Sequence, residues 1–133
     1  MDEPVLKYVL ACRNDLGDAR MLLEMGRQFN VPRLAHSALI HLFRGVFLHT
    51  QNRYPPLTVD LTDLARQSGA DTLLDREAMD LLQELTEAGQ AVLNPVYHQK
   101  MAEEYDLVKC RRMLRKAREI QARLVHWIGG EPN

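Results

Sequence analysis

The sequence has few of the features on which disulfide-stapled, metal-binding, exported or membrane proteins depend. Its 133 residues include only two cysteines, Cys12 and Cys110, which are far apart and have no metal-ligand spacing. Both lie inside helical patterns, so we interpret them as small buried hydrophobic residues in a reducing compartment. The N-terminus carries acids where a signal peptide needs bases, and no apolar run approaches the roughly 18 residues of a membrane span. These absences predict a soluble, cytoplasmic protein.

A second absence concerns β-structure, because no segment of useful length alternates between apolar and polar residues. The composition, 46% hydrophobic and 26% charged, is that of a globular domain rather than a disordered chain. At this length the chain fits one domain, and neither a linker nor an internal repeat divides it. We therefore expect a single all-α domain over residues 1–130, followed by a frayed tail at 131–133.

Apolar residues recur at three- and four-residue intervals, which predicts three long helices and two short ones. Their expected ranges are 4–26, 32–51, 60–67, 76–88 and 101–128. The second is apolar on nearly every side, so it should be the central helix, with Leu39, Phe43 and Val46 in the core. Asp75 is expected to cap the fourth helix, and Gly89 to end it in the left-handed conformation. Together these features predict an antiparallel up-and-down helix bundle.

The charges are segregated along the chain, although the formal net charge is only −1. Residues 60–106 carry eleven acids against three bases, a net of −8, whereas residues 109–123 carry seven bases against one acid, a net of +6. Within the basic segment, Arg111, Arg115 and Arg118 fall on one helical face, where like charges oppose helix formation. Two kinds of partner could neutralise these arginines. We favour the acidic segment, within the chain or across a dimer; the alternative is the phosphates of a nucleotide or RNA.

Several local patterns follow one another in a characteristic order. An Asp-Leu-x-x-Ala segment with a leucine pair (15–23) precedes a helix with alanine and histidine (35–38), and a proline pair then leads into Thr-Val-Asp-Leu (55–61). An Asn-Pro-Val-Tyr loop (94–97) and the long last helix complete the series. In this order the chain resembles the HEPN family (higher eukaryotes and prokaryotes nucleotide-binding domain) over nearly its whole length, with Val59 in place of the family's histidine.

The resemblance implies a helical bundle that acts as an accessory or binding module rather than a self-sufficient enzyme, and that needs no cofactor. Such modules often sit beside a small nucleotidyltransferase partner, in toxin–antitoxin or substrate-binding arrangements, and bind a nucleotide or nucleic acid. A helix that is apolar on several sides of so small a bundle also favours a homodimer. A purely structural homodimeric interaction domain is therefore an alternative function.

Two loops carry further candidates for a nucleotide pocket. Arg53 and Tyr54 lie in one loop and Tyr97 in the other, and tyrosine rings are suited to stack on a base. The alternative is that half-buried rings pin these loops to the core, and the sequence does not decide between the two.

A second alternative function is that of a metal-independent RNase acting at a homodimer cleft. Family members that cut RNA use an arginine and a histidine four to six residues apart, and Arg44 and His49 have that spacing. Residues five apart lie about 140° apart around a helix, so we prefer structural roles for both. His36 and His41 are also five apart, which is not the spacing of a helical zinc pair, and we expect them to be structural. The sequence predicts no metal site.

Overall fold

A computed structural model describes residues 1–91, 96 and 103–129, and this part of the chain is helical without any strand. Its α-helices are α1 (Glu3–Glu24), α2 (Val31–Gln51), α3 (Leu61–Ser68), α4 (Arg76–Ala91) and α6 (Leu107–Gly129), joined in places by the short 3₁₀ turns η1 (Gln28–Asn30) and η2 (Ala70–Leu73). The predicted all-α class is confirmed, with three helices of 21 to 23 residues. None of the described helices is both long and apolar enough to cross a bilayer.

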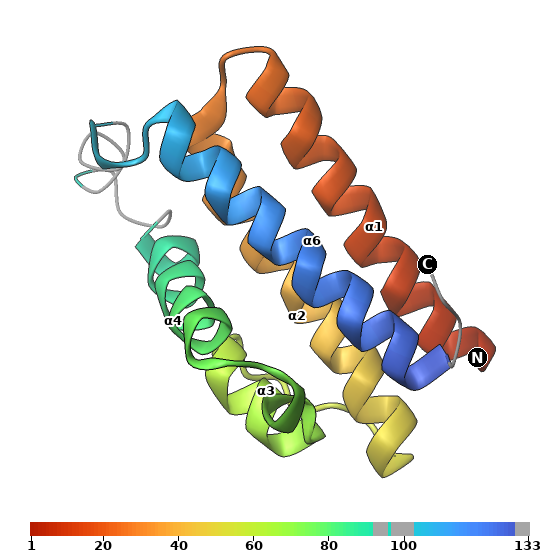
Figure 1. The fold of residues 1–133 in the computed structure, drawn as a ribbon. Helices are drawn as coiled ribbons and strands as arrows, with labels where there is room; N and C mark the ends of the chain where they lie inside the picture. The colour runs from red at the N-terminus through yellow and green to blue at the C-terminus, as the bar shows by residue number, and fades with distance from the viewer. Residues whose placement is uncertain (92–95, 97–102, 130–133) are drawn as a thin grey trace.

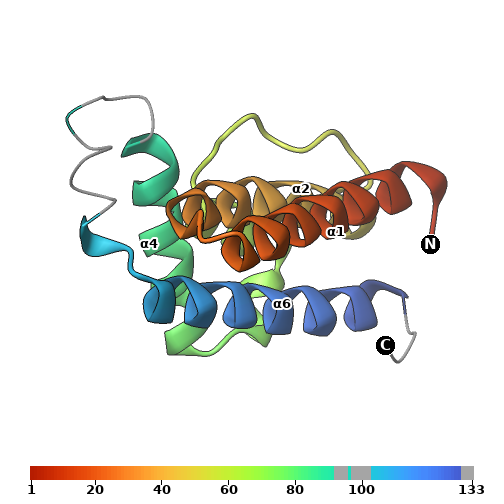
Figure 2. The same ribbon diagram turned by 90° about the horizontal axis from the view of Figure 1, so that it is seen from above.

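The helices pack as a bundle around α2 (Figure 1). α1 packs against α2 and α6, whereas α3 and α4 pack against the other side of α2. Figure 2 shows α1 and α2 in one layer, with α6 running along them in the next layer and α4 crossing one end. Helices that follow one another are neighbours, because α1 contacts α2, α2 contacts α3, and α3 contacts α4.

The central position of α2 follows from its composition. Leu39, Phe43 and Val46 are completely buried, as the sequence predicts, and eight further residues of α2 are buried around them. A helix that contacts α1, α3, α4 and α6 has little surface left for solvent, which is why polar residues are scarce along it. Burial of this stripe supplies much of the hydrophobic stabilisation of the fold.

Aspartates begin several helices by accepting backbone hydrogen bonds that the first turn cannot make internally. Asp60 accepts from the amides of Thr62 (3.0 Å) and Asp63 (3.3 Å) at the start of α3. Asp75 accepts from the amide of Ala78 (2.8 Å) and caps α4, as predicted.

Two helix boundaries differ from the sequence prediction. Gly89 does not end α4, which continues to Ala91, and the reason for a glycine there is a close contact: a Cβ at this position would overlap the imidazole of His36. The last helix begins at Leu107 rather than at Met101. Asp106 sets that boundary by accepting from the amide of Lys109 (2.8 Å). Met101 itself, like the tail 131–133, lies outside the described residues.

Both cysteines are fully buried and free of disulfide bonds, as predicted. Burial raises the pKa of the Cys12 thiol to about 12 and that of the Cys110 thiol to about 11. Thiols that stay protonated and inaccessible are unreactive, so these residues serve packing rather than chemistry.

Candidate anion-binding groove between α1 and α6

The bases of α6 divide between two sides of the helix. Two lysines seven residues apart face α4 and meet acids there. Lys109 forms ion pairs with Glu84 (3.1 Å) and Glu104 (3.8 Å), and Lys116 pairs with Glu77. Acids of the segment 60–106 therefore neutralise part of the basic segment within one chain. This is the interpretation that the sequence favours.

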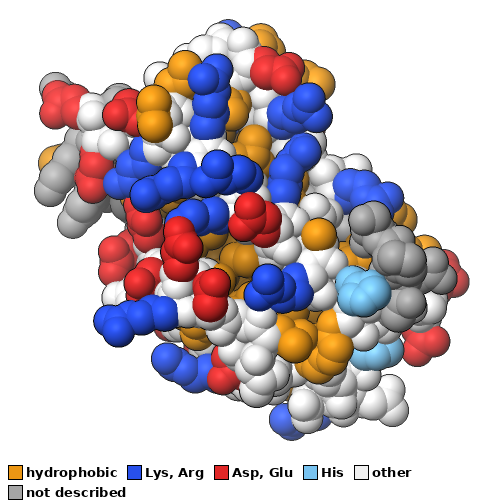
Figure 3. All heavy atoms as spheres, in the orientation of Figure 1, with side chains coloured by type: hydrophobic (Ala, Val, Ile, Leu, Met, Phe, Trp, Pro, Cys, Tyr) orange, Lys and Arg blue, Asp and Glu red, His pale blue; other side chains and the backbone are white. Residues whose placement is uncertain are grey.

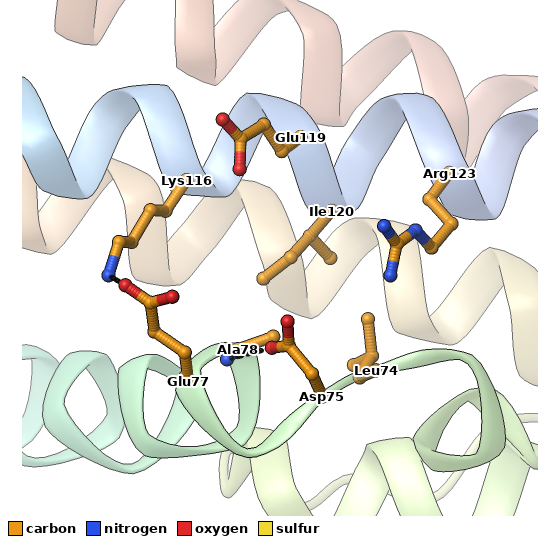
Figure 4. A pocket seen from close by; sticks show the side chains of 8 residues that line it. All are labelled: Leu74, Asp75, Glu77, Ala78, Lys116, Glu119, Ile120 and Arg123. Carbon is orange, nitrogen blue, oxygen red and sulfur yellow. Dashed lines mark hydrogen bonds and ion pairs between the residues drawn. The ribbon is translucent and has the colours of Figure 1, made fainter.

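Figure 4 shows this side of α6, where a small cavity of about 60 Å³ lies between α6 and the start of α4. Lys116 and Arg123 point toward α4, whereas Glu119 points away from it. Arg123 donates from Nη1 to the backbone carbonyl of Leu73 (3.0 Å) and so ties α6 to η2. Cations on this side are occupied by contacts that hold the bundle together.

The arginines Arg111, Arg115 and Arg118 lie on a different side of α6. Together with Arg20 of α1 they line a groove of about 560 Å³ between the two helices. Within the described part of the chain, Arg111, Arg115 and Arg118 form no hydrogen bond or ion pair, whereas Arg20 pairs with Glu24 (3.2 Å). The three site candidates on α6 are thus brought together, and no acid among the described residues forms an ion pair with them.

The groove has an apolar floor formed by Leu23, Leu114 and Ala122, and it also includes the carboxylates of Glu24 and Glu119. Four arginines against two glutamates leave an excess of positive charge. Figure 3 shows Lys and Arg side chains gathered over α6 and the adjoining end of α1, with several Asp and Glu side chains beside them over α4. An anion entering this groove meets the less neutralised of the two sides of α6.

Arg118 is the only half-buried member of the three α6 arginines in the groove. Its Nε is out of contact with solvent and has no hydrogen-bond partner among the described residues, and the same holds for the Nε of Arg44 on α2. The chemistry of the groove therefore follows from its lining, where several guanidinium groups favour an anion with several oxygen atoms.

Arg20 was not among the residues singled out from the sequence. A signal for it exists, because Arg13 and Arg20 are seven residues apart on α1 and both are exposed. Seven residues are close to two helical turns, so these side chains form one row. Only the packing of α1 beside α6 shows that part of this row borders the α6 arginines.

Arg44 and His49, the candidates for RNA cleavage, do not line the groove. Arg44 is half-buried on α2, and its Nε lacks both solvent contact and a described partner. His49 is exposed in the last turn of the same helix. Because residues five apart point in different directions around a helix, the RNase hypothesis gains no geometric support and stays a prediction.

Two of the three loop candidates, Arg53 and Tyr54, do not line the groove either. The guanidinium of Arg53 lies over the ring of Phe47, 5.3 Å from its centroid. Tyr54 is 93% exposed, so its ring does not pin the loop to the core. Tyr97 lies outside the described residues, so the predicted nucleotide pocket at these loops stays a prediction.

Two histidines of α2, His36 and His41, have structural partners. The Nε2–H of His36 donates to the backbone carbonyl of Val59 (2.8 Å), and burial lowers the pKa of this imidazole. His41 lies 3.6 Å from the carboxylate of Asp15, which also accepts from the hydroxyl of Ser37 (2.7 Å). This polar contact between α1 and α2 was not predicted. Among the described residues, no three His, Cys, Asp or Glu side chains are grouped so as to hold a metal ion.

No family model matches this sequence, and no curated protein and no solved structure matches it either.

Proposed function

We propose that this protein is a binding module of the HEPN type that holds the phosphate groups of a nucleotide or nucleic acid in the groove between α1 and α6. The observation that carries the proposal is the division of bases on α6. Its two lysines in ion pairs meet acids of the chain, whereas Arg111, Arg115 and Arg118 face the groove without an acid bonded to them. Arginine binds phosphate through two parallel hydrogen bonds, so arginines without protein partners favour a phosphate ligand.

The electrostatic repulsion between these arginines also supports the proposal that the groove binds an anionic ligand. Like charges at positions i and i+4 of a helix oppose folding by a few tenths of a kcal/mol per pair. An acid from α1 or α4 would relieve that repulsion, as Glu84 does for Lys109 at 3.1 Å. For the groove arginines, a bound polyanion relieves it instead.

The HEPN assignment is consistent with the order of helices and with the buried second helix. A module of this kind, pairing with a small nucleotidyltransferase, presents a ligand rather than transforming it. The exposed groove suits that role because the ligand remains accessible to a second protein.

The test is a binding measurement on purified protein with a fluorescein-labelled single-stranded RNA, followed by fluorescence anisotropy at low salt. We expect Arg115→Gln to weaken binding about tenfold, the loss of roughly one charge-assisted hydrogen bond. Arg112→Gln is the matched control, since it removes the same charge from the same helix but does not line the groove.

Arg112 is exposed and has no described partner, so its replacement should leave the fold intact and change binding by less than about twofold. Equal losses for Arg112→Gln and Arg115→Gln would mean that binding follows overall charge and not the groove. Absence of any binding by the unaltered protein would contradict the proposal outright.

A further inference from the structure

The polar side chains that line the groove are of only two kinds, arginine and glutamate. Proteins that read a base stack it on a planar side chain or hydrogen-bond its edge with amides, hydroxyls, carboxylates or arginines. The rest of this lining consists of Leu23, Leu114 and Ala122, so the groove has no aromatic ring, amide or hydroxyl. Its arginines are the groups that bind phosphate oxygens, and an arginine held by a phosphate is not available to read the edge of a base. The groups left for a base are two carboxylates, one of which is paired with Arg20.

The arrangement along α6 fits a row of phosphates rather than a single one. Arg111, Arg115 and Arg118 span seven residues, or about 10 Å of helix axis at ~1.5 Å per residue. Three arginines at separate points of this row can each contact a different phosphate of an extended chain, whereas a single phosphate is reached by one or two of them. Arg20 faces them from α1, so the row is bordered on both sides.

The two carboxylates in the groove act against small anions. Glu24 holds Arg20 at 3.2 Å, and Glu119 is exposed beside the α6 arginines. A single phosphate meets one or two arginines together with a nearby carboxylate. A run of phosphates contacts all three α6 arginines at once, and its total attraction exceeds the repulsion from the acids.

We propose that the groove recognises a run of about three consecutive phosphate groups and does not distinguish what those phosphates carry. The ligand chemistry is a linear polyphosphate, which exists both as a nucleic-acid backbone and as inorganic polyphosphate. This inference rests on the proposed function, since it specifies the ligand class of the same site.

The experiment is a competition against the labelled RNA. Unlabelled oligouridine and oligoadenine of equal length should displace it within about threefold of each other. Inorganic polyphosphate of matched phosphate number should compete as well, and its potency relative to the RNA identifies which source the groove prefers. Uridine monophosphate and inorganic phosphate should compete at least about a hundredfold less well, because each offers one phosphate.

Salt dependence gives an independent readout. For three neutralised phosphates of a single strand, the logarithm of the binding constant should fall with the logarithm of salt concentration with a slope of about −2. Arg115→Gln should reduce that slope by about 0.7, and Arg112→Gln should leave it unchanged. Arg115→Lys should keep the slope but weaken binding severalfold, since it retains the charge and loses the two-pronged contact.

Two failures are distinguishable. If the RNA binds but oligouridine and oligoadenine differ more than tenfold, or if the mononucleotide competes as well as the polymer, the inference is overturned while the proposed function stands. If neither RNA nor polyphosphate binds at low salt, both fall together.

Discussion

The contact between His36 and Gly89 places the most specific demand on a single position. The imidazole occupies the space that a Cβ at position 89 would need, and its ring is held in place by the carbonyl of Val59. Gly17 is the opposite case, because it lies in the middle of α1 with nothing within 4 Å of where a Cβ would be. The space around Gly17 therefore admits a methyl group, whereas the space around Gly89 does not.

We expect Gly89→Ala to lower the free energy of unfolding by about 1–3 kcal/mol, since overpacking forces either the ring or the helix to move. Gly17→Ala should raise it by about 0.5–1 kcal/mol, the usual gain of alanine over glycine inside a helix. Urea denaturation of both variants provides the measurement. Equal effects of the two substitutions would show that helix propensity, and not the His36 contact, governs position 89.

His36 also makes stability depend on pH. Its folded-state pKa lies below the ordinary value of 6.5, mainly because burial disfavours the charged ring, although the bond to Val59 acts in the opposite direction. Protonation must place a hydrogen on Nδ1, which faces Gly89. The unfolded chain therefore takes up the proton first as pH falls below 6.5, and the folded state loses stability.

The free energy of unfolding should accordingly decrease from about pH 7.5 to about pH 5, and His36→Gln should flatten that decrease. Asp60, whose pKa is lowered chiefly by the Thr62 hydroxyl, acts only in a lower window, where pH falls through and below 3.8. A pH profile that His36→Gln leaves unchanged would assign the effect to another group.

At the scale of helices, the sequence predicts what is local and misses what depends on neighbours. Asp75 is identifiable as a cap because the bond it accepts, from Ala78, is three residues away. Gly89 has the same local appearance as a helix end, yet its cause is a ring from α2. The sequence predicts a start of α6 that is too early, because helical periodicity continues upstream of Asp106. Only the geometry shows that Asp106 caps the helix.

The same distinction explains the candidate site. The sequence shows that seven bases cluster at 109–123, but it does not show which helix lies on each side of them. Lys109 and Lys116 are seven residues apart and therefore share a direction, and the structure places α4 in that direction. Arg111, Arg115 and Arg118 border α1, and no acid of α1 forms an ion pair with them. Charge composition predicts a basic segment, whereas only packing identifies its unpaired side.

For the whole molecule, one relevant surface is the outward side of α1, where four apolar side chains are exposed along the helix and at its C-cap. Leu6 and Leu10 are each 41% exposed, and Met21 and Met25 are 61% and 59% exposed. Exposed apolar residues on one helix face are typical of a protein interface. If two copies pack these helices antiparallel about a two-fold axis between residues 15 and 16, Leu10 meets the partner's Met21.

The same register places Lys7 opposite the partner's Glu24, so the charges at both ends of the seam are complementary. We therefore expect a homodimer, seen by light scattering at twice the 15.3 kDa mass of one chain. Met21→Lys should abolish it because the new charge would lie against Leu10. Val108→Lys is the control, since Val108 is 76% exposed but belongs to α6.

Cross-linking decides the orientation of the pair. Both native thiols are fully buried, and their raised pKa values of about 12 and about 11 keep them protonated, so introduced cysteines should be the ones that react. In the antiparallel register, Leu10→Cys should form a disulfide with Met21→Cys when the two variants are mixed, and neither should cross-link to itself. Self-cross-linking of Leu10→Cys would mean that the helices run parallel. A monomer at tens of micromolar would contradict the expected dimer, because the exposed apolar side chains of α1 would then remain in contact with solvent.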